Sequence, residues 1–177
     1  MLENISHDNR YHKTLNFLKK HIQVSSTILD LGVYNPLSRH MQQQGYEVKN
    51  TSGEDLDEDQ SSLINSKQEV VTAFEILEHL LSPYQVLKSI QAEKLVVSVP
   101  LRLWFSPAYR SKNDLWDRHY HEFEDWQLDW LLEKTGWKII AREKWTNPNS
   151  SFGIRTLLRY FTTRYYIVFA KKNKQEN

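Results

Sequence analysis

Apolar positions along the chain switch repeatedly between a helical spacing and short continuous runs. From His7 to Ile22 they recur at helical intervals, which predicts an amphipathic helix. The aliphatic run 27–32 ends in Gly32, as a buried strand entering a turn would. The later segments continue this alternation, with helices predicted over 38–44, 82–90 and 122–135, and strands over 46–50, 69–74, 94–100, 137–145 and 164–170.

Strands that alternate with helices predict an α/β fold, in which a doubly wound, mostly parallel sheet carries helices on both faces. No linker divides the chain, so residues 1–172 are expected to form a single domain. Two segments are longer than ordinary connections: the aromatic and basic insertion 101–121, and the insertion 146–163, where a helix over 154–160 fits the pattern. The polar residues 173–177 are predicted to be a disordered tail.

Composition narrows the class of protein further. The 177 residues suffice for one core, and the absence of cysteine excludes disulfides and thiolate metal sites. The N-terminal segment is charged, and the longest apolar runs have the length of a strand. The sequence therefore predicts a cytoplasmic protein without a transmembrane segment.

Charge is distributed unevenly between the two halves. After residue 100, Lys and Arg outnumber Asp and Glu by 14 to 9, whereas the first hundred residues hold 9 basic and 13 acidic side chains. The excess of basic side chains after residue 100 has two interpretations: solvated surface faces, or a surface that binds an acidic substrate. Nucleic acid is not expected as a partner, because the pI is about 7.9 and the first half is acidic.

Three stretches carry a family resemblance. Residues 28–32 read Ile-Leu-Asp-Leu-Gly, and residues 73–80 read Ala-Phe-Glu-Ile-Leu-Glu-His-Leu with Ser-Pro shortly behind. The strand 96–100, a later His-Tyr-His-Glu-Phe and a Gly-Trp before a strand complete the order. With these motifs the chain resembles the class I S-adenosylmethionine (SAM)-dependent methyltransferases, in particular the subgroup with a FExLEH block.

The resemblance implies a methyltransferase-like sheet whose last strand is antiparallel. The segment 51–68 is short for the helix and strand that the family inserts there, so one edge strand is expected to be missing. It also implies SAM as the cofactor and a small or medium-sized molecule as the methyl acceptor. The residues that match the cofactor-binding positions are Asp30, Gly32, Asn35, Asn50, Asp55, Leu56, Phe74 and Glu75.

The chain departs from the family at two of these places. Its cofactor loop, residues 30–36, keeps only the first of the usual glycines, and Asn50 stands where the family has an acid for the ribose hydroxyls. Two interpretations stay open: a SAM-dependent methyltransferase acting on a metabolite, sugar or lipid precursor, or a non-catalytic binding module that has lost SAM. A dinucleotide-dependent oxidoreductase is excluded, because no Gly-x-Gly-x-x-Gly turn occurs.

Candidate catalytic side chains follow the third and fourth predicted strands. Glu75, His79 and His119 are the candidate catalytic residues. Histidine suits proton transfer near neutral pH, so His79 is a candidate base, with a structural role as the alternative. The candidate acceptor-binding residues in the insertion 101–121 are Trp104, Tyr109, Arg118, His119 and His121. His119 and His121 are expected at the mouth of the pocket and no metal is expected, because two histidines without a third ligand make a weak site.

A basic and apolar stretch lies within the second insertion. Arg155, Arg159 and Arg164 alternate there with Leu157, Leu158 and aromatic residues. Such a stretch indicates an ordinary packed helix, a membrane surface or a site for a phosphorylated acceptor.

Overall fold

In a computed structural model, which describes residues 2–147 and 153–173, the chain folds into helices around one mixed sheet. The helices are α1 (Leu2–His21), α2 (Pro36–Gln43), α3 (Ser61–Ile64), α4 (Pro83–Ser89), α5 (Asp125–Lys134) and α6 (Ile154–Phe161), with one 3-10 turn, η1 (Leu77–His79). The strands are β1 (Thr27–Asp30), β2 (Glu47–Asn50), β3 (Val70–Phe74), β4 (Lys94–Pro100), β5 (Trp137–Thr146) and β6 (Thr163–Lys172).

The sheet has six strands in the order β2-β1-β3-β4-β6-β5. Strands β2, β1, β3 and β4 pair in parallel, and β6 is antiparallel to both of its neighbours. The predicted α/β sheet with an antiparallel last strand is therefore confirmed. The expected loss of an edge strand is confirmed as well, because the segment between β2 and β3 contributes α3 and no strand among the described residues.

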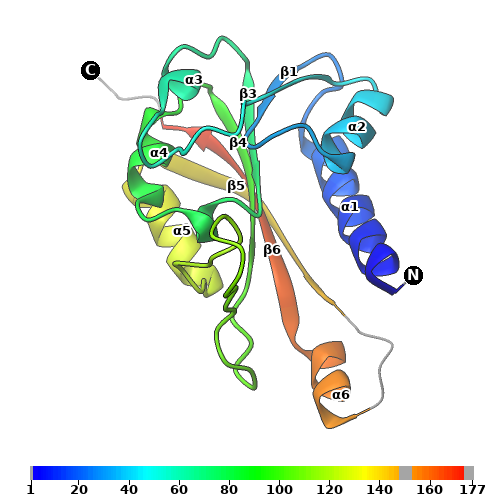
Figure 1. The fold of residues 1–177 in the computed structure, drawn as a ribbon. Helices are drawn as coiled ribbons and strands as arrows, with labels where there is room; N and C mark the ends of the chain where they lie inside the picture. Colours follow the sequence, from blue (N-terminus) through cyan, green and yellow to red (C-terminus); the bar gives the residue numbers. More distant parts are fainter. Residues whose placement is uncertain (1, 148–152, 174–177) are drawn as a thin grey trace.

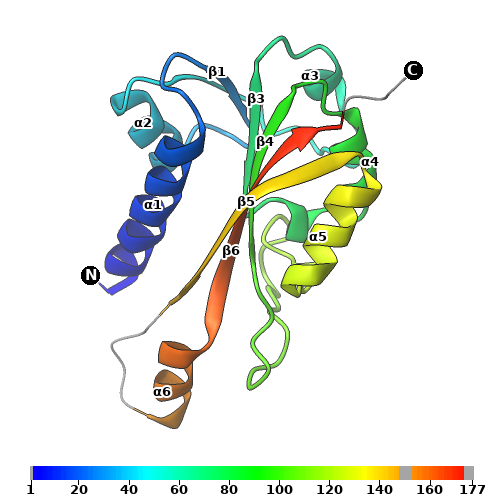
Figure 2. The ribbon, with the colours of Figure 1, turned by 180° about the vertical axis from the view of Figure 1, so that it is seen from behind.

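Helices cover both faces of the sheet (Figures 1 and 2). Helices α1 and α2 lie on one face, where Phe17, Leu18 and Met41 pack against the strand residues Ile28 and Val96. Helices α3, α4 and α5 lie on the other face, over a larger core of buried side chains that includes Leu63, Leu87, Leu128, Leu132, Leu29, Val71, Leu95 and Val97. Neighbouring strand residues alternate between these cores, which gives the central strands their continuous apolar sequence.

The connection before α4 is held differently from what the sequence suggests. Ser82 occupies the N-cap position, where serine is usual, but its side chain makes no capping hydrogen bond. The carboxylate of Asp57 accepts from the backbone N–H groups of Leu81 and Ser82 instead, at 2.7 and 2.8 Å. A residue 25 positions earlier thus ties the loop after β2 to the start of α4.

Helix α6 and the ends of β5 and β6 extend beyond the two-faced body of the sheet (Figure 1). None of the α6 side chains is buried, and Ile154 and Phe161 are 80% and 81% exposed. The predicted helix therefore forms, but it packs only at the surface, beside β5 and β6 and with Leu158 half-buried. Within the described ranges, no helix combines the length and apolar character needed to cross a membrane.

Candidate functional site

Two adjoining cavities open where the parallel strands end. The larger cavity measures about 640 Å³ and the inner cavity about 330 Å³, and Gly32, Val33 and Ile76 line both. The larger cavity lies over the loop that follows β2, with apolar walls from Leu56, Leu80, Leu81, Leu115 and Trp116. The inner cavity is covered by α1 and lined by Arg10, Tyr11, Thr14, Asp30, Asn35, Phe74, Glu75 and Ser98. Ligands of open α/β sheets bind at this edge.

The turn after β1 needs only one glycine. Gly32 has φ +105°, a conformation that other residues rarely adopt, and its N–H donates to Thr51 Oγ1 at 2.8 Å. Asn35 then caps α2 in extended geometry, accepting from the backbone N–H groups of Leu37 and Ser38. The loop therefore leads into a capped helix N-terminus instead of continuing as a glycine-rich turn.

A buried hydrogen-bond network holds this turn in place. The carboxylate of Asp30 accepts from Thr72 Oγ1 at 2.6 Å, Ser38 Oγ at 2.9 Å and Asn50 Nδ2 at 3.1 Å. Burial raises the pKa of Asp30, and these three donors oppose the rise. The Asn50 amide lies within hydrogen-bond distance of the Gly32 carbonyl as well, at 3.2 Å. The side chains of Asp30 and Asn50 therefore hold the loop in place. Thr51, the residue directly after β2, lines the larger cavity.

Glu75 sits at a strained position directly after β3. Its φ of 57° is positive, a strain that typically costs about 1–3 kcal/mol and concentrates at functional sites. Ser98 Oγ donates to its carboxylate at 2.9 Å, and Arg10 Nη1 lies 3.6 Å from Oε2. Burial raises the pKa of Glu75, with Arg10 and Ser98 acting in the opposite direction. A carboxylate and a guanidinium thus face the inner cavity together.

Arg10 is a site residue that the sequence reasoning missed. The helix around it was predicted, but which of its side chains reaches the sheet edge depends on how the helix docks. A signal was present: Arg10, Thr14 and Phe17 follow helical spacing, and the latter two are buried. An arginine in line with buried positions of an amphipathic helix is directed toward the core.

Glu78 and His79 lie on η1, next to the larger cavity. The Glu78 side chain is buried, and its Oε2 has no hydrogen-bond partner among the described residues. Burial raises the pKa of Glu78 well above its ordinary value, and the nearby Glu75 adds to the rise. The His79 Nδ1 is 3.0 Å from the carbonyl oxygen of Arg118. A carbonyl can only accept, so Nδ1 carries the proton and Nε2 keeps the lone pair when His79 is neutral.

The segment after β4 is anchored to η1. The Glu78 carbonyl accepts from the backbone N–H groups of Tyr120 and His121, at 2.8 and 3.2 Å. His119 lies beside His79, with ring centroids 4.8 Å apart in an edge-to-face arrangement. Burial lowers the pKa of His119, as does the neighbouring His79. The two predicted histidines, 40 positions apart in sequence, are therefore brought together.

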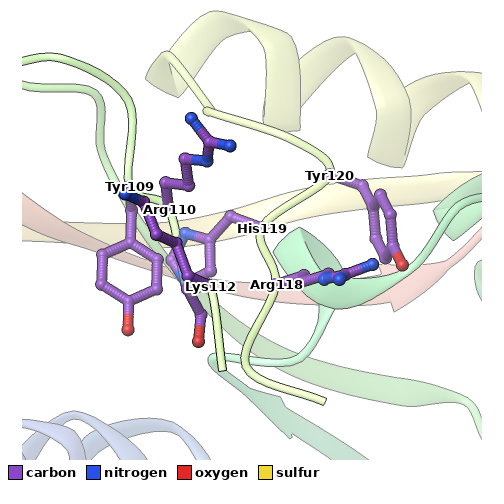
Figure 3. A pocket seen from close by; sticks show the side chains of 7 residues that line it. Tyr109, Arg110, Lys112, Arg118, His119 and Tyr120 are labelled. Atoms are coloured by element: carbon purple, nitrogen blue, oxygen red, sulfur yellow. The ribbon is translucent and has the colours of Figure 1, made fainter. Parts of the chain in front are cut away.

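A third, basic pocket of about 450 Å³ adjoins this segment (Figure 3). The rings of Tyr109 and His119 contact each other within it at a tilt of 48°, with centroids 4.5 Å apart. Its other lining residues are Arg110, Ser111, Lys112, Arg118 and Tyr120. Of these, Tyr120 also lines the larger cavity, so the basic pocket and the larger cavity meet there.

The predicted site residues fall into groups in the structure. Asp55 and Leu56 line the larger cavity with Gly32, whereas Asp30, Asn35, Phe74 and Glu75 line the inner one. Tyr109, Arg118 and His119 line the basic pocket. The structure does not bring Trp104 to these three cavities; it is 71% exposed and contacts Phe105 edge-on. His121 does not line these three cavities either; its ring centroid lies 5.8 Å from that of Phe123, and its Nε2 is buried without a hydrogen-bond partner among the described residues.

The sheet order and the helices on both of its faces are those of a class I SAM-dependent methyltransferase domain. The model of a family described as "Methyltransferase domain" matches residues 2–142, and the chain belongs to this family. None of the curated proteins matches the sequence.

Solved structures share the fold at low sequence identity. A 1,6-didemethyltoxoflavin-N1-methyltransferase from Burkholderia thailandensis, with S-adenosylhomocysteine bound, aligns over 95% of this chain and 84% of its own at 14% identity and a TM-score of 0.66. A SAM-dependent methyltransferase from Archaeoglobus fulgidus aligns over 97% and 95% at 16% identity and 0.63. The [4+2]-cyclase SpnF aligns over 92% and 81% at 13% identity and 0.57.

Proposed function

We propose that the chain transfers a methyl group from SAM to a small or medium-sized acceptor, such as a metabolite, sugar or lipid precursor. The observation that carries the proposal is the turn at Gly32. Its backbone bends at φ +105° between the two cavities, and a side chain there would contact Ile76, 3.5 Å away. A bare backbone at the end of β1 lets an elongated ligand span both cavities.

The lining residues fit the two ends of SAM. In the larger cavity, Leu56 and Leu80 offer apolar walls for an adenine ring, and Asp55 a carboxylate for polar groups. In the inner cavity, Arg10 and Glu75 present one positive and one negative group to an amino-acid end. The chain compensates for its missing glycines with the Asp30 network, which holds the turn without them.

When bound, SAM supplies a methyl group activated on a cationic sulfur. The task of the chain is then to hold an acceptor atom in line with it, and such positioning is worth roughly 7–11 kcal/mol. An acceptor that must lose a proton needs a base. Among the candidates Glu75, His79 and His119, we favour Nε2 of His79, because its lone pair is free in the neutral tautomer and the ring lines the larger cavity.

A second candidate function is a binding module with this fold that has lost methyl transfer. The specific observation in its favour is the cofactor loop, where Val33, Tyr34 and Asn35 replace the glycine-rich sequence. SpnF, whose structure is similar, is a [4+2]-cyclase, so its name gives a different activity for the same fold.

Calorimetry with S-adenosylhomocysteine on the full chain separates the two. We expect a dissociation constant below about 1 mM, equivalent to about −4 kcal/mol or tighter. At 100 times that constant, the ligand should stabilise the fold by about 2.7 kcal/mol and raise Tm by roughly 5–10 °C. Absence of heat and of any Tm shift at millimolar ligand would establish the binding-module alternative.

A further inference from the structure

Three side chains that can bind a metal converge between the larger cavity and the basic pocket. Glu78 and His79 come from η1, and His119 comes from the segment after β4. One ligand atom from each lies within 4.8 Å of the others, and Glu78 Oε1 is 3.8 Å from His79 Nε2. Ligands at about 2.0–2.2 Å from one tetrahedral ion lie roughly 3.3–3.6 Å apart, so the three side chains would have to move closer by about 1 Å to hold a cation.

The orientation of the His79 ring suits metal binding. Its Nδ1–H donates to the Arg118 carbonyl at 3.0 Å, which leaves the Nε2 lone pair facing Glu78. Histidines that bind metals almost always donate their other ring N–H to a carbonyl or carboxylate in this way. The contact also links the two segments, because Arg118 directly precedes His119.

Glu78 supplies the second, independent indication. Its side chain is 1% exposed, and Oε2 has no hydrogen-bond partner among the described residues. The nearby Glu75 has Arg10 at 3.6 Å and a hydrogen bond from Ser98, whereas the charged-group contact of Glu78 within 4 Å is His79, whose Nε2 lies 3.8 Å from Oε1. A buried carboxylate requires a compensating charge or donors, and a divalent cation supplies such a charge.

We propose that Glu78, His79 and His119 form a site for a divalent transition-metal cation such as Zn²⁺, Mn²⁺ or Co²⁺. One carboxylate oxygen and two imidazole nitrogens suit these ions better than Mg²⁺, which prefers oxygen ligands and retains its waters. Three protein ligands leave coordination positions open, as in catalytic metal sites. His79 lines the larger cavity and His119 the basic pocket, so those positions would be reached from both.

The site revises the expectation that no metal binds here. That expectation assumed that the histidines at 119 and 121 would have to form the site without a third ligand. The structure pairs His119 with His79 instead, and Glu78 completes the set. A cation at this point would offer positive charge to an acceptor oxygen in place of the free lone pair of His79. The proposal does not depend on methyl transfer, because cation binding is measured without SAM.

The test uses the untagged full chain, stripped with a chelator and titrated with Co²⁺ and Mn²⁺. We expect one equivalent of Co²⁺ to produce visible absorption bands. Bound Mn²⁺ should show electron–nuclear coupling to two imidazole nitrogens in pulsed electron paramagnetic resonance. This second measurement needs no variant. Coupling to no nitrogen, or the absence of a saturable site for either ion, would overturn the proposal.

Variants then assign the ligands. His79→Ala, His119→Ala and Glu78→Gln should each weaken Co²⁺ binding at least tenfold, whereas His12→Ala, an exposed histidine on α1, should leave it unchanged. Unchanged binding in the folded His79→Ala and His119→Ala proteins would place the ion elsewhere. Calorimetry with S-adenosylhomocysteine on the same stripped protein keeps the two proposals apart, since cofactor binding is expected without the cation.

Discussion

The turn after β1 and the segment after β4 both lie at the ligand-binding edge of the sheet, but they are built in opposite ways. The turn spans residues 31–35 and is braced by two hydrogen bonds, from Gly32 N–H to Thr51 Oγ1 and from Asn50 Nδ2 to Asp30. The segment 101–124 is anchored near its ends, where Arg102 N–H donates to the Phe123 carbonyl at 2.8 Å. Its middle is exposed, with Trp116 accessible over 72% of its surface.

This contrast separates two tasks. Cofactor contacts need a rigid backbone, so a change in the turn is expected to affect both folding and binding. Acceptor contacts have to suit different molecules. In a long segment that is anchored near its ends, exposed side chains can be substituted with little effect on the stability of the core. The predictions below test that division, from the largest expected effect to the smallest.

Replacing Gly32 with Val should reduce affinity for S-adenosylhomocysteine at least 100-fold, equivalent to about 2.7 kcal/mol. A β-branched residue cannot readily adopt φ +105°, and the turn would shift away from both cavities. Because the new Cβ would meet only Ile76, 3.5 Å away, the fold should lose about 1–3 kcal/mol and survive. Calorimetry and urea denaturation measure the two quantities.

Gly136→Val is the matched control for this change. Gly136 also has positive φ, +90°, and nothing lies within 4 Å of the side chain that would be added. It precedes β5, away from the residues that line the cavities. The control should show a similar loss of stability with unchanged affinity. Equal affinities in the two variants would move the ligand away from the β1 turn.

Replacing Asn50 with Asp should destabilise the fold by about 1–3 kcal/mol at neutral pH. The new carboxylate would lie where Asn50 Nδ2 now donates to Asp30 at 3.1 Å, so a donor would become a like charge. Burial already raises the pKa of Asp30, and protonation of either carboxyl would remove the repulsion. The loss of stability relative to wild type should therefore shrink as the pH falls toward 4. Urea denaturation at several pH values measures it. Tighter cofactor binding without destabilisation would show that an acid at 50 binds the ribose as in the family.

The sequence predicts the fold well because the signal is local. Each central strand is a short apolar run, and helices begin at Pro36 and Pro83 as expected of proline in a first turn. The Trp137 strand and the last strand were also located correctly, apart from one to two residues at their ends. The contact between Asp57 and the start of α4 was not predicted, since a side-chain cap from a distant loop leaves no periodic pattern.

The site is less predictable, because it depends on which loops meet. Motifs identify Gly32 and Glu75 through their place directly after strands. They do not reveal Arg10, whose position depends on helix docking, or the pairing of His79 with His119 across 40 residues. Asn50 illustrates a third limit: its place in the chain suggests a ligand contact, but its amide is engaged inside the protein.

Replacing Arg10 with Ala should weaken S-adenosylhomocysteine at least tenfold, about 1.4 kcal/mol. The change removes the guanidinium beside Glu75 and leaves a buried carboxylate facing the inner cavity. Arg39→Ala, an exposed arginine on α2, is the control and should bind normally. Full affinity in folded Arg10→Ala would show that the inner cavity does not take the amino-acid end of the cofactor. Calorimetry gives the comparison.

The smallest effect on cofactor binding is expected at Arg118. Its side chain is exposed and lines the basic pocket, and only its backbone carbonyl accepts from His79 Nδ1, a contact that alanine keeps. Arg118→Ala should therefore change S-adenosylhomocysteine affinity by less than threefold, about 0.65 kcal/mol, while methyl transfer to the acceptor falls. Trp116→Ala is the contrasting variant in the same segment, because Trp116 is also exposed but lines the larger cavity. It should weaken the cofactor about fivefold, about 1 kcal/mol. If calorimetry ranks the two variants in the reverse order, the basic pocket, and not the larger cavity, receives the cofactor. The division between a cofactor turn and an acceptor segment would then be wrong.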